Sequence, residues 1–242
     1  MGKLIIAQRR GKGSSRYRAH SFNFAGKATH PVLTQNNKTE VFTGTIVDFI
    51  KCAAHTAPLA QVEYSNGDAC LMLACEGLKV GDTVTVGAAA EAVPGNIMPL
   101  SVVPEGTLVF NIESMPGDGG KFVRASGVFA RVVAKTANGI LVRLPSKKQR
   151  FFNENCRASI GVLAGGGRID KPLLKAGNKF FKFKARNHLY PKTSASKMNA
   201  VDHPYGNKRS SRKSKAMPVA RNAPPGRKVG MIAARRTGRK KK

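Results

Sequence analysis

Residues 59–74 read Leu-Ala-Gln-Val-Glu-Tyr, then Ser-Asn-Gly-Asp, then Ala-Cys-Leu-Met-Leu-Ala. Two apolar, β-prone runs flank the Asn66-Gly67 pair. Asn-Gly between such runs is a strong hairpin signal, because both central residues of a type I′ turn have positive φ. We therefore predict two antiparallel strands joined by a type I′ turn at this pair, and we take the hairpin as the starting point of the fold.

The neighbouring segments extend this hairpin into a small β domain. Residues 41–50 precede it and are rich in β-formers, and residues 79–86 follow a turn at Glu76-Gly77. Four or five short strands with tight turns and no convincing helix predict a closed barrel, since closure removes exposed sheet edges. Residues 40–99 hold seven acids against Lys51 and Lys79. We expect this barrel to act as a spacer or to face protein.

A second set of short strands begins after residue 100, where the charge balance reverses to nine basic and four acidic residues by position 160. The predicted strands are residues 107–112, 128–135, 140–144 and 159–163. They indicate a second small barrel. Binding groups usually lie on the loops of a rigid scaffold. The basic residues that we expect on these loops are Lys121, Arg124, Lys147, Lys148 and Arg150.

The glycine-rich run at residues 116–121 resembles a phosphate loop only superficially. A Walker loop requires Gly where this chain has Met115, and Ser or Thr where it has Phe122. We interpret the run as a turn whose glycines let the backbone approach a phosphate.

The net charge of +29 is distributed very unevenly along the chain. Residues 1–39 hold eight basic and no acidic residues, residues 40–160 hold eleven of each, and residues 161–242 hold 23 basic and two acidic residues. The sequence thus predicts a neutral body with two cationic extensions, which need a dense anionic partner to become ordered. Nucleic acid is the commonest such partner. A membrane surface is the alternative, but the extensions contain no amphipathic basic helix with a broad apolar face.

Both extensions interleave aromatic residues with cations, and no period of 3.6 or 2 runs through residues 1–39. In the first, Tyr17, Phe22 and Phe24 lie among arginines, and in the second, residues 175–186 alternate basic and aromatic residues. One interpretation is a disordered, solvated arm. The other is an arm that grips phosphates while its aromatics stack on RNA, ordering only on its partner.

Residues 198–206, Met-Asn-Ala-Val-Asp-His-Pro-Tyr-Gly, form an almost uncharged motif within the basic tail. Pro204 and Gly206 predict a fixed turn, and a turn of this kind fits where RNA backbones crowd together. An enzyme that uses Asp202 and His203, with Ser194 or Ser196, is an alternative. Adjacent side chains point in different directions, however, and no pocket with an oxyanion hole is predicted nearby.

The four cysteines raise the question of a metal site. Cys52 and His55 are three apart, and Cys70 and Cys75 lie in a strand-like run where an odd separation points them to opposite faces. We expect small buried hydrophobic residues rather than zinc ligands. The N-terminal apolar run is too short for a secretory signal, so we expect an intracellular protein with reduced cysteines.

Several short motifs resemble the universal large-subunit ribosomal protein L-two family, and the tail at residues 223–239 resembles its eukaryotic and archaeal branch. The motifs are Gly95-Asn96, Pro99-Leu100, Pro104-Glu105-Gly106-Thr107, Asn111-Ile112-Glu113, Pro116-Gly117-Asp118-Gly119-Gly120, Leu144-Pro145-Ser146, Met198-Asn199 and Val201-Asp202-His203-Pro204.

The resemblance implies an oligonucleotide-binding-fold barrel followed by an SH3-like barrel, with extensions threaded into large-subunit ribosomal RNA. It also implies that the segment around His203 approaches the peptidyl transferase centre. Two departures from the family are Tyr205, where bacterial relatives have a second His, and Asn207-Lys208-Arg209, where many members have a glycine run.

We therefore expect an all-β chain with a basic extension at 1–39, an oligonucleotide-binding-fold barrel at 40–92, an SH3-like barrel at 93–164 and a basic extension at 165–242. The expected role is a structural, non-enzymatic part of the large ribosomal subunit, which binds its RNA, supports subunit association and buttresses the peptidyl transferase centre. A free nucleic-acid chaperone or chromatin protein is the alternative.

The expected partners are large-subunit ribosomal RNA, neighbouring ribosomal proteins and the small subunit, without a membrane or a small-molecule substrate. We expect no cofactor, with Mg²⁺ held by the RNA, and a cytoplasmic location in the ribosome, or a nucleolar one during assembly in a eukaryote. The residues expected to contact RNA are Arg9, Arg10, Arg16, Arg18, Lys121, Arg124, Lys147, Lys148, Arg150, Lys182, Lys184, Arg186, Asn199, His203, Pro204, Lys208, Arg209, Arg227, Lys228, Arg235 and Arg236.

Overall fold

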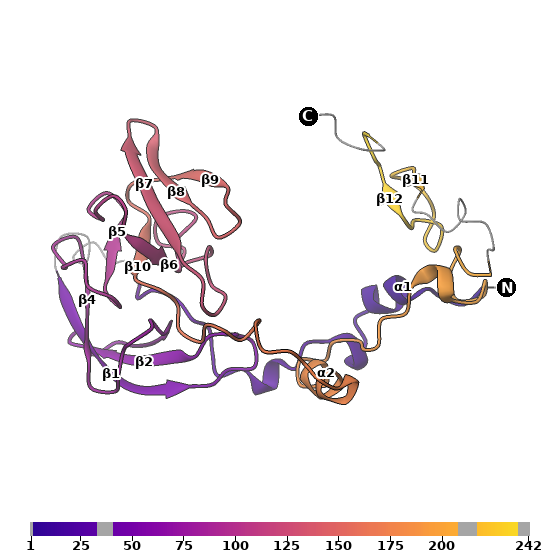
Figure 1. Ribbon diagram of the computed structural model, residues 1–242, viewed down its shortest axis with the longest axis horizontal. Helices are drawn as coiled ribbons and strands as arrows, with labels where there is room; N and C mark the ends of the chain where they lie inside the picture. The colour runs from indigo at the N-terminus through magenta and orange to yellow at the C-terminus, as the bar shows by residue number, and fades with distance from the viewer. Residues whose placement is uncertain (1, 33–40, 208–216, 237–242) are drawn as a thin grey trace. The chain divides into compact units, whose positions relative to one another are not determined.

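The computed structural model describes residues 2–32, 41–207 and 217–236. They form two compact units. The first, Ser21–Pro172, holds the long sheet and is called the barrel unit below. The second, called the extension unit, comprises the described parts of Met1–His20 and Leu173–Lys242. The described chain is mostly sheet with few helices, in agreement with the expected all-β class (Figure 1).

One ten-stranded sheet runs through the barrel unit in the order β3-β2-β1-β4-β5-β10-β6-β7-β8-β9 (Figure 1). Its pairs are antiparallel except β4 with β5. The strands are β1 (Phe42–Ile50), β2 (Leu59–Tyr64), β3 (Ala69–Leu73), β4 (Thr83–Val86), β5 (Ile97–Pro99), β6 (Leu108–Phe110), β7 (Ala130–Thr136), β8 (Gly139–Arg143), β9 (Gln149–Phe152) and β10 (Arg157–Ile160). This arrangement agrees with two successive small barrels.

The β2-β3 hairpin has the predicted strands but a different turn. Gly67 has a φ of 85°, whereas Asn66 does not have positive φ, so the type I′ prediction is wrong. The Gly67 N–H donates to the Tyr64 carbonyl (2.9 Å), and the Tyr64 N–H donates to the Asp68 carbonyl (2.8 Å). These bonds define a three-residue loop that ends with glycine in the left-handed region. The Asn66 side chain bonds to the Asp68 backbone and carboxylate, which stabilises this longer loop.

Three apolar clusters form the core of the barrel unit. The first barrel encloses Ile46, Val62, Met72 and Val84 among others, and the second encloses residues of β7, β8 and β10. A third cluster includes Phe110 and residues from both barrels, so it joins them within one unit. Alternating burial along the strands provides these inward-facing residues.

Some strands depart from the sequence-based expectation, among them β5, which lies outside every predicted strand. The first barrel's last predicted strand is shorter than residues 79–86, because the Asp82 carboxylate accepts the Lys79 N–H (2.7 Å) and holds residues 79–82 in a turn. β9 was not predicted, and Arg150 lies on this strand rather than on a loop. The turn before it is tight, since the Lys147 N–H donates to the Leu144 carbonyl (2.8 Å), so the chain pairs again at once.

The extension unit contains regular elements where irregular arms were predicted. They are α1 (Ile6–Gly11), the 3₁₀ turns η1 (Ser15–Tyr17) and η4 (Ala195–Lys197), α2 (Ala176–Lys184) and the parallel pair β11 (Pro218–Val219) and β12 (Met231–Ile232); a further turn, η2 (Ser21–Asn23), begins the barrel unit. Each helix carries basic residues in its last turn, which is favourable at the negative end of a helix dipole. No residue of α2 is buried, so this helix does not pack into an apolar core of its unit.

Candidate RNA-binding surface

The 198–206 motif is a closed backbone loop within the extension unit. The N–H groups of Asp202 and His203 donate to the Asn199 carbonyl (3.0 and 3.2 Å), and the Asn207 N–H donates to the Met198 carbonyl (3.2 Å). Pro204 lies exposed between them. These bonds agree with the predicted fixed turn and present its exposed backbone and side chains as one rigid shape.

Gly206 is required for this loop to close. It is buried, and a Cβ built on it would lie 2.2 Å from the Asn199 carbonyl oxygen and 2.6 Å from that of Met198. Both neighbours are backbone atoms that cannot rotate away. Glycine here serves a close backbone approach rather than a positive φ.

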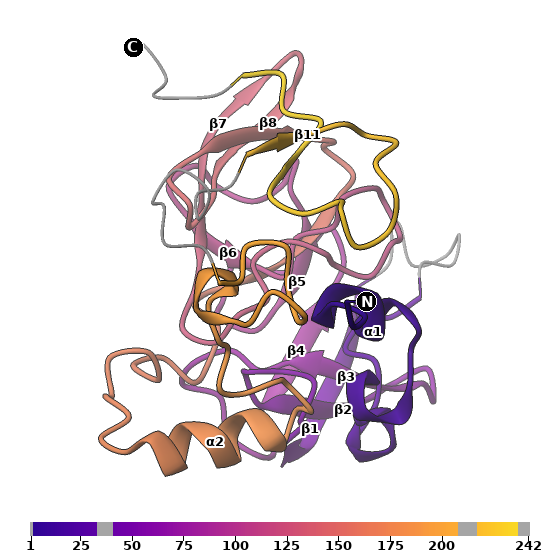
Figure 2. The same ribbon diagram turned by 90° about the vertical axis from the view of Figure 1, so that its right-hand side faces the viewer.

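The first residues of the chain pack against the motif. The Lys3 N–H donates to the Val201 carbonyl (2.9 Å), and α1 lies beside the orange segment that carries the motif (Figure 1, Figure 2). His203 borders two open hollows of about 330 and 320 Å³ that α1 residues also line, and Arg10 lines the second. The structure therefore brings the two predicted extensions together, which the sequence did not indicate.

His203 has the environment of a neutral hydrogen-bonding group. Its Nδ1 accepts the Tyr205 N–H (3.1 Å), and partial burial lowers the pKa of the imidazole. The neutral ring therefore carries its proton on Nε2, which is left as a donor. Among the described residues no hydrogen bond joins this ring to Asp202, and the Ser194 hydroxyl is bonded to Ser196 instead (3.1 Å). A catalytic triad is absent from this arrangement.

Tyr205 has a defined structural contact in this chain. Its hydroxyl accepts the Met217 N–H (3.3 Å) and donates to the Val229 carbonyl (3.4 Å). The ring thus ties the motif to the segments that flank β11 and β12. Lys208 and Arg209, two of the expected RNA contacts, lie outside the described residues.

A second cluster of cations and aromatics surrounds α2. An open hollow of about 340 Å³ is lined by Arg16, Tyr17, Phe180 and Lys184 among others. The Asn187 side-chain amide donates to backbone carbonyls of residues 15 and 18, which fixes the N-terminal segment beside the helix. Aromatic residues spaced among cations in both extensions were the sequence signal for this cluster.

The other expected contacts of the extension unit do not line these hollows. Arg9 is exposed at the end of α1, and the Arg18 guanidinium donates to the Gly13 carbonyl (3.0 Å). The rest comprise Lys182 on α2, the half-buried Arg186 just after it, Arg227 and Lys228 in an exposed turn, and Arg235 and Arg236 beyond β12.

In the barrel unit, the glycine-rich run does not leave its backbone free for a phosphate. The N–H groups of Gly117 and Gly119 both donate to the Glu113 carboxylate (3.2 Å each), and that of Gly120 donates to Asp118 (3.0 Å). The phosphate-cradle interpretation is therefore wrong, because internal carboxylates already occupy these donors. Lys121 is exposed at the end of the run.

Glu113 is fully buried and forms an ion pair with Arg157 (2.8 Å). Burial raises the pKa of Glu113, but hydrogen bonds from Arg157 outweigh this effect and hold it below its usual value. Arg157 also donates to the Pro31 carbonyl (2.8 Å), and the half-buried Arg124 donates to the carbonyls of Ala28 and Gly120 (2.7 and 2.6 Å). These bonds anchor residues 28–31 to the second barrel.

His30 lies in this anchored segment and is 3% exposed. Its Nε2 lies 2.7 Å from the Asn111 carbonyl oxygen. Burial, together with the positive charge of Arg157, lowers its pKa to about 4. His30 is therefore a neutral core group at physiological pH.

The Arg124 guanidinium donates to internal carbonyls. Its expected role as an RNA contact stays a prediction.

The remaining expected contacts of the barrel unit cluster around β9 and its turn. Lys147 and Lys148 are exposed in the turn, and the Arg150 guanidinium lies over the rings of Phe122 and Phe152 (4.6 and 5.5 Å). Arg150 is nevertheless an exposed residue. Three cations thus share one end of the second barrel.

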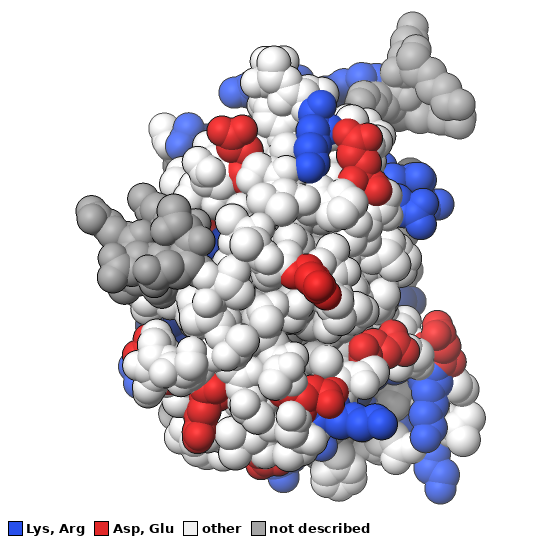
Figure 3. Space-filling view, turned by 90° about the vertical axis from the view of Figure 1, so that its left-hand side faces the viewer, with Lys and Arg blue, Asp and Glu red and all other residues white. Residues whose placement is uncertain are grey.

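Another face of the barrel unit has a different charge. Figure 3 shows Asp and Glu side chains scattered over a largely uncharged surface, with few Lys and Arg among them. This face is poorly suited to phosphate and agrees with the acidic balance of the first barrel.

Within the described part of the chain, the cysteines are free, and Cys52, Cys75 and Cys156 are buried. The Cys70 Sγ contacts the Tyr64 hydroxyl at 3.7 Å. No group of three or more His, Cys, Asp or Glu residues is placed to hold a metal there. The same residues include no helix long and apolar enough to cross a membrane.

Comparison with known proteins places this chain in a family. Residues 93–223, more than half of the chain, match the model described as "Ribosomal Proteins L2, C-terminal domain". The chain belongs to the ribosomal protein L2 family. The matched part includes the second barrel and the 198–206 motif.

Relatives in the L2 family extend the similarity to nearly the whole chain. A large ribosomal subunit protein uL2 of Haloarcula marismortui is 49% identical over 99% of this chain and 98% of its own length. The proteins of the same name from Archaeoglobus fulgidus and Methanococcoides burtonii are 50% and 45% identical, covering 98% and 99% of this chain and 99% and 100% of their own lengths. The resemblance drawn from the short motifs is confirmed.

Proposed function

We propose that this chain is a structural constituent of the large ribosomal subunit that binds and orders its ribosomal RNA. The observation that carries this proposal is the near full-length similarity to proteins named large ribosomal subunit protein uL2. The two units support it with cations at exposed positions and with a neutral, preshaped loop between basic segments. Arginine and lysine would neutralise phosphates where RNA strands crowd together.

The geometry of the 198–206 motif supports a finer role, which the resemblance to the family implies. His203 offers a neutral Nε2 donor at the surface of a rigid loop, which is suited to an acceptor on RNA. In the proposed role the loop buttresses the peptidyl transferase centre without chemistry of its own, and the RNA holds Mg²⁺. The acidic barrel face would meet neighbouring ribosomal proteins, and other surfaces would bridge to the small subunit. The corresponding location is the ribosome in the cytoplasm.

The test replaces the endogenous protein by tagged wild-type chain and follows it in sucrose gradients at high salt. Co-sedimentation with large subunits supports the proposal. Free migration, or association with DNA alone, would identify a chaperone or chromatin protein instead. A second arm compares peptide-bond formation in assembled subunits carrying His203→Ala. Retained activity supports a structural role, whereas complete loss with intact assembly would indicate protein-centred catalysis.

A further inference from the structure

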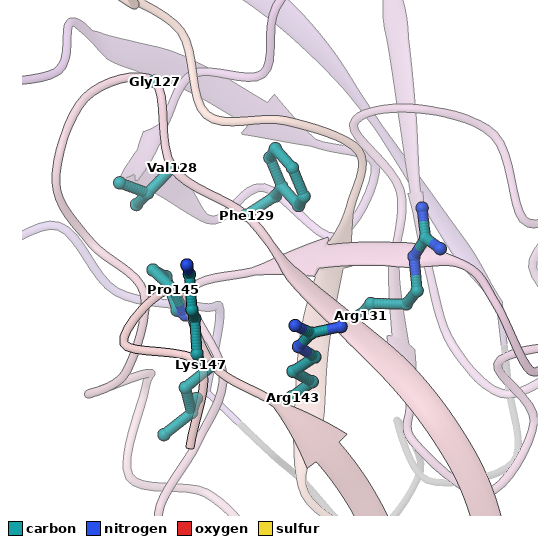
Figure 4. Close-up of a pocket in the computed structure, with 8 residues that line it drawn as sticks. Gly127, Val128, Phe129, Arg131, Arg143, Pro145 and Lys147 are labelled. Atoms are coloured by element: carbon teal, nitrogen blue, oxygen red, sulfur yellow. The ribbon is translucent and has the colours of Figure 1, made fainter. Parts of the chain in front are cut away.

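An open hollow of about 450 Å³ lies at one end of the second barrel, between β7, β8 and the turn that leads to β9 (Figure 4). Its volume falls within the roughly 300–1,000 Å³ of small-ligand sites. The walls combine apolar side chains with cations. The lining includes Phe129, Arg131, Arg143, Leu144, Pro145 and Lys147.

Two arginines of the lining lie opposite each other on neighbouring strands. Arg131 on β7 and Arg143 on β8 are register partners, and both are exposed. Like charges directly opposite in a sheet destabilise it. Within the described chain, neither guanidinium forms a hydrogen bond or an ion pair with a protein group. An anion bound beside them would attract both guanidinium groups and so offset their mutual repulsion.

Lys147 adds a third cation with an unusual backbone. Its φ is 64°, in the left-handed region that turns normally fill with Gly, Asn or Asp. A residue held in this region costs about 1 kcal/mol or more and often marks a functional position. Figure 4 shows the Lys147 side chain bordering the same hollow as Arg143. The turn thus tolerates strain at the position that brings its ammonium group to the site.

Phe129 provides a flat apolar surface at this site. Its side chain is 44% exposed, and among the described aromatic pairs its ring has no partner. Val128, Leu144 and Pro145 extend the apolar wall. An aromatic face beside cations is the combination that binds an unpaired base and its phosphate. An acidic peptide would use the cations but leave the ring face without a flat partner.

We propose that this hollow binds one unpaired nucleotide of an RNA strand, with the base stacked on Phe129 and its phosphate held by Arg143, Lys147 and Arg131. The site deepens the proposed function, on which it rests, by naming the RNA element that it takes. Duplex RNA does not fit, because its bases are stacked inside the helix and present no free face.

The experiment uses the full chain and measures its affinity by fluorescence anisotropy for two probes, an octamer of uridine and a paired RNA duplex of equal length. The test variant is Phe129→Leu, which keeps an apolar side chain but removes the aromatic face. The matched control is Phe151→Leu, because Phe151 is also half exposed in the same barrel, on β9, but does not line the hollow. A second test variant, Arg143→Gln, is compared with Lys79→Gln in the first barrel.

Phe129→Leu is expected to weaken octamer binding by about 5-fold or more, since stacking on an aromatic contributes about 1–3 kcal/mol per base, while duplex binding and the control stay at wild-type values. Arg143→Gln is expected to lower the salt slope for the octamer by about 0.7, the loss of one phosphate contact on a single strand. If Phe129→Leu and the wild type bind the octamer with equal affinity, the proposed nucleotide site is refuted. Displacement of the octamer by a glutamate-rich peptide at equal concentration would refute it as well. If wild-type binding to large-subunit RNA still falls steeply with salt, the proposed function survives that failure.

Discussion

Arg157→Met tests how strongly the buried ion pair stabilises the barrel unit. The substitution leaves the Glu113 carboxylate, which is 0% exposed, without its guanidinium partner and removes the donor to the Pro31 carbonyl. Breaking a buried pair in this way costs about 3–5 kcal/mol, because one charge stays buried and uncompensated. For a unit of this size, about 2–4 °C per kcal/mol gives a fall in Tm of roughly 6–20 °C.

The assay is thermal and urea unfolding of the full chain, followed by far-ultraviolet circular dichroism. Lys79→Met, at an exposed position without a side-chain bond in the described structure, is the control and should change stability by less than about 0.5 kcal/mol. Glu113→Gln combined with Arg157→Met should be less destabilising than the two single changes added together, since neither charge then remains alone. A loss below about 1 kcal/mol for Arg157→Met would refute the assignment of this pair as a structural anchor.

Two further perturbations follow from the same structure. The His30 pKa of about 4 lies below the unfolded value of 6.5, so the unfolded chain binds more protons between these values and stability falls as pH drops from 6.5. Between pH 6.5 and 4.5, a range above the ordinary Glu pKa, the free energy of unfolding measured by urea titration should fall by on the order of 2–3 kcal/mol. His30→Gln should make the free energy of unfolding less dependent on pH. An unchanged pH profile for the variant would exclude His30 as the cause. Gly206→Ala should force the 198–206 loop open, because its Cβ meets backbone atoms, and should speed hydrogen exchange of the His203 and Asn207 amides by about 5-fold or more. Gly177→Ala on α2, where a Cβ meets nothing within 4 Å, should leave those amides unchanged or the helix slightly stabilised, and equal exchange in both variants would remove the claim that Gly206 closes the loop.

The strands of the barrel unit were largely predictable, because their apolar runs and turn residues are local features. The β2-β3 hairpin is confirmed, and its turn differs only because the Asn66 side chain bonds to Asp68 and stabilises a three-residue loop. Such a choice between turn types depends on side-chain bonds that the Asn-Gly pair does not specify. The boundaries at residues 39/40, 92/93 and 164/165 stay predictions.

Long-range pairing was not predictable from composition. The glycine-rich run predicts a turn that lets the backbone approach a phosphate, whereas the Glu113 carboxylate accepts the N–H groups of Gly117 and Gly119. The sequence does not pair Glu113 with Arg157, because the two residues lie far apart along the chain. Composition likewise does not relate the first residues of the chain to the 198–206 motif, although the Lys3 N–H donates to the Val201 carbonyl.

The nucleotide site could not be found from sequence for a related reason. Lys147 was expected on the second barrel's loops, but Arg131 and Arg143 become a site only when β7 and β8 pair in register. Phe129 precedes its strand and carries no sequence signal that separates it from a core aromatic. Strand register, rather than residue type, determines which side chains share this end of the barrel.

In the proposed function, exposed cations of both units neutralise phosphates of large-subunit ribosomal RNA. The most direct measurement is the salt dependence of binding between the full chain and transcribed large-subunit RNA, from about 50 to 200 mM monovalent salt. With six or more phosphates contacted, the log–log slope should be about −4 or steeper, which corresponds to an affinity loss of about 250-fold or more over this range of salt. A slope near zero would contradict it.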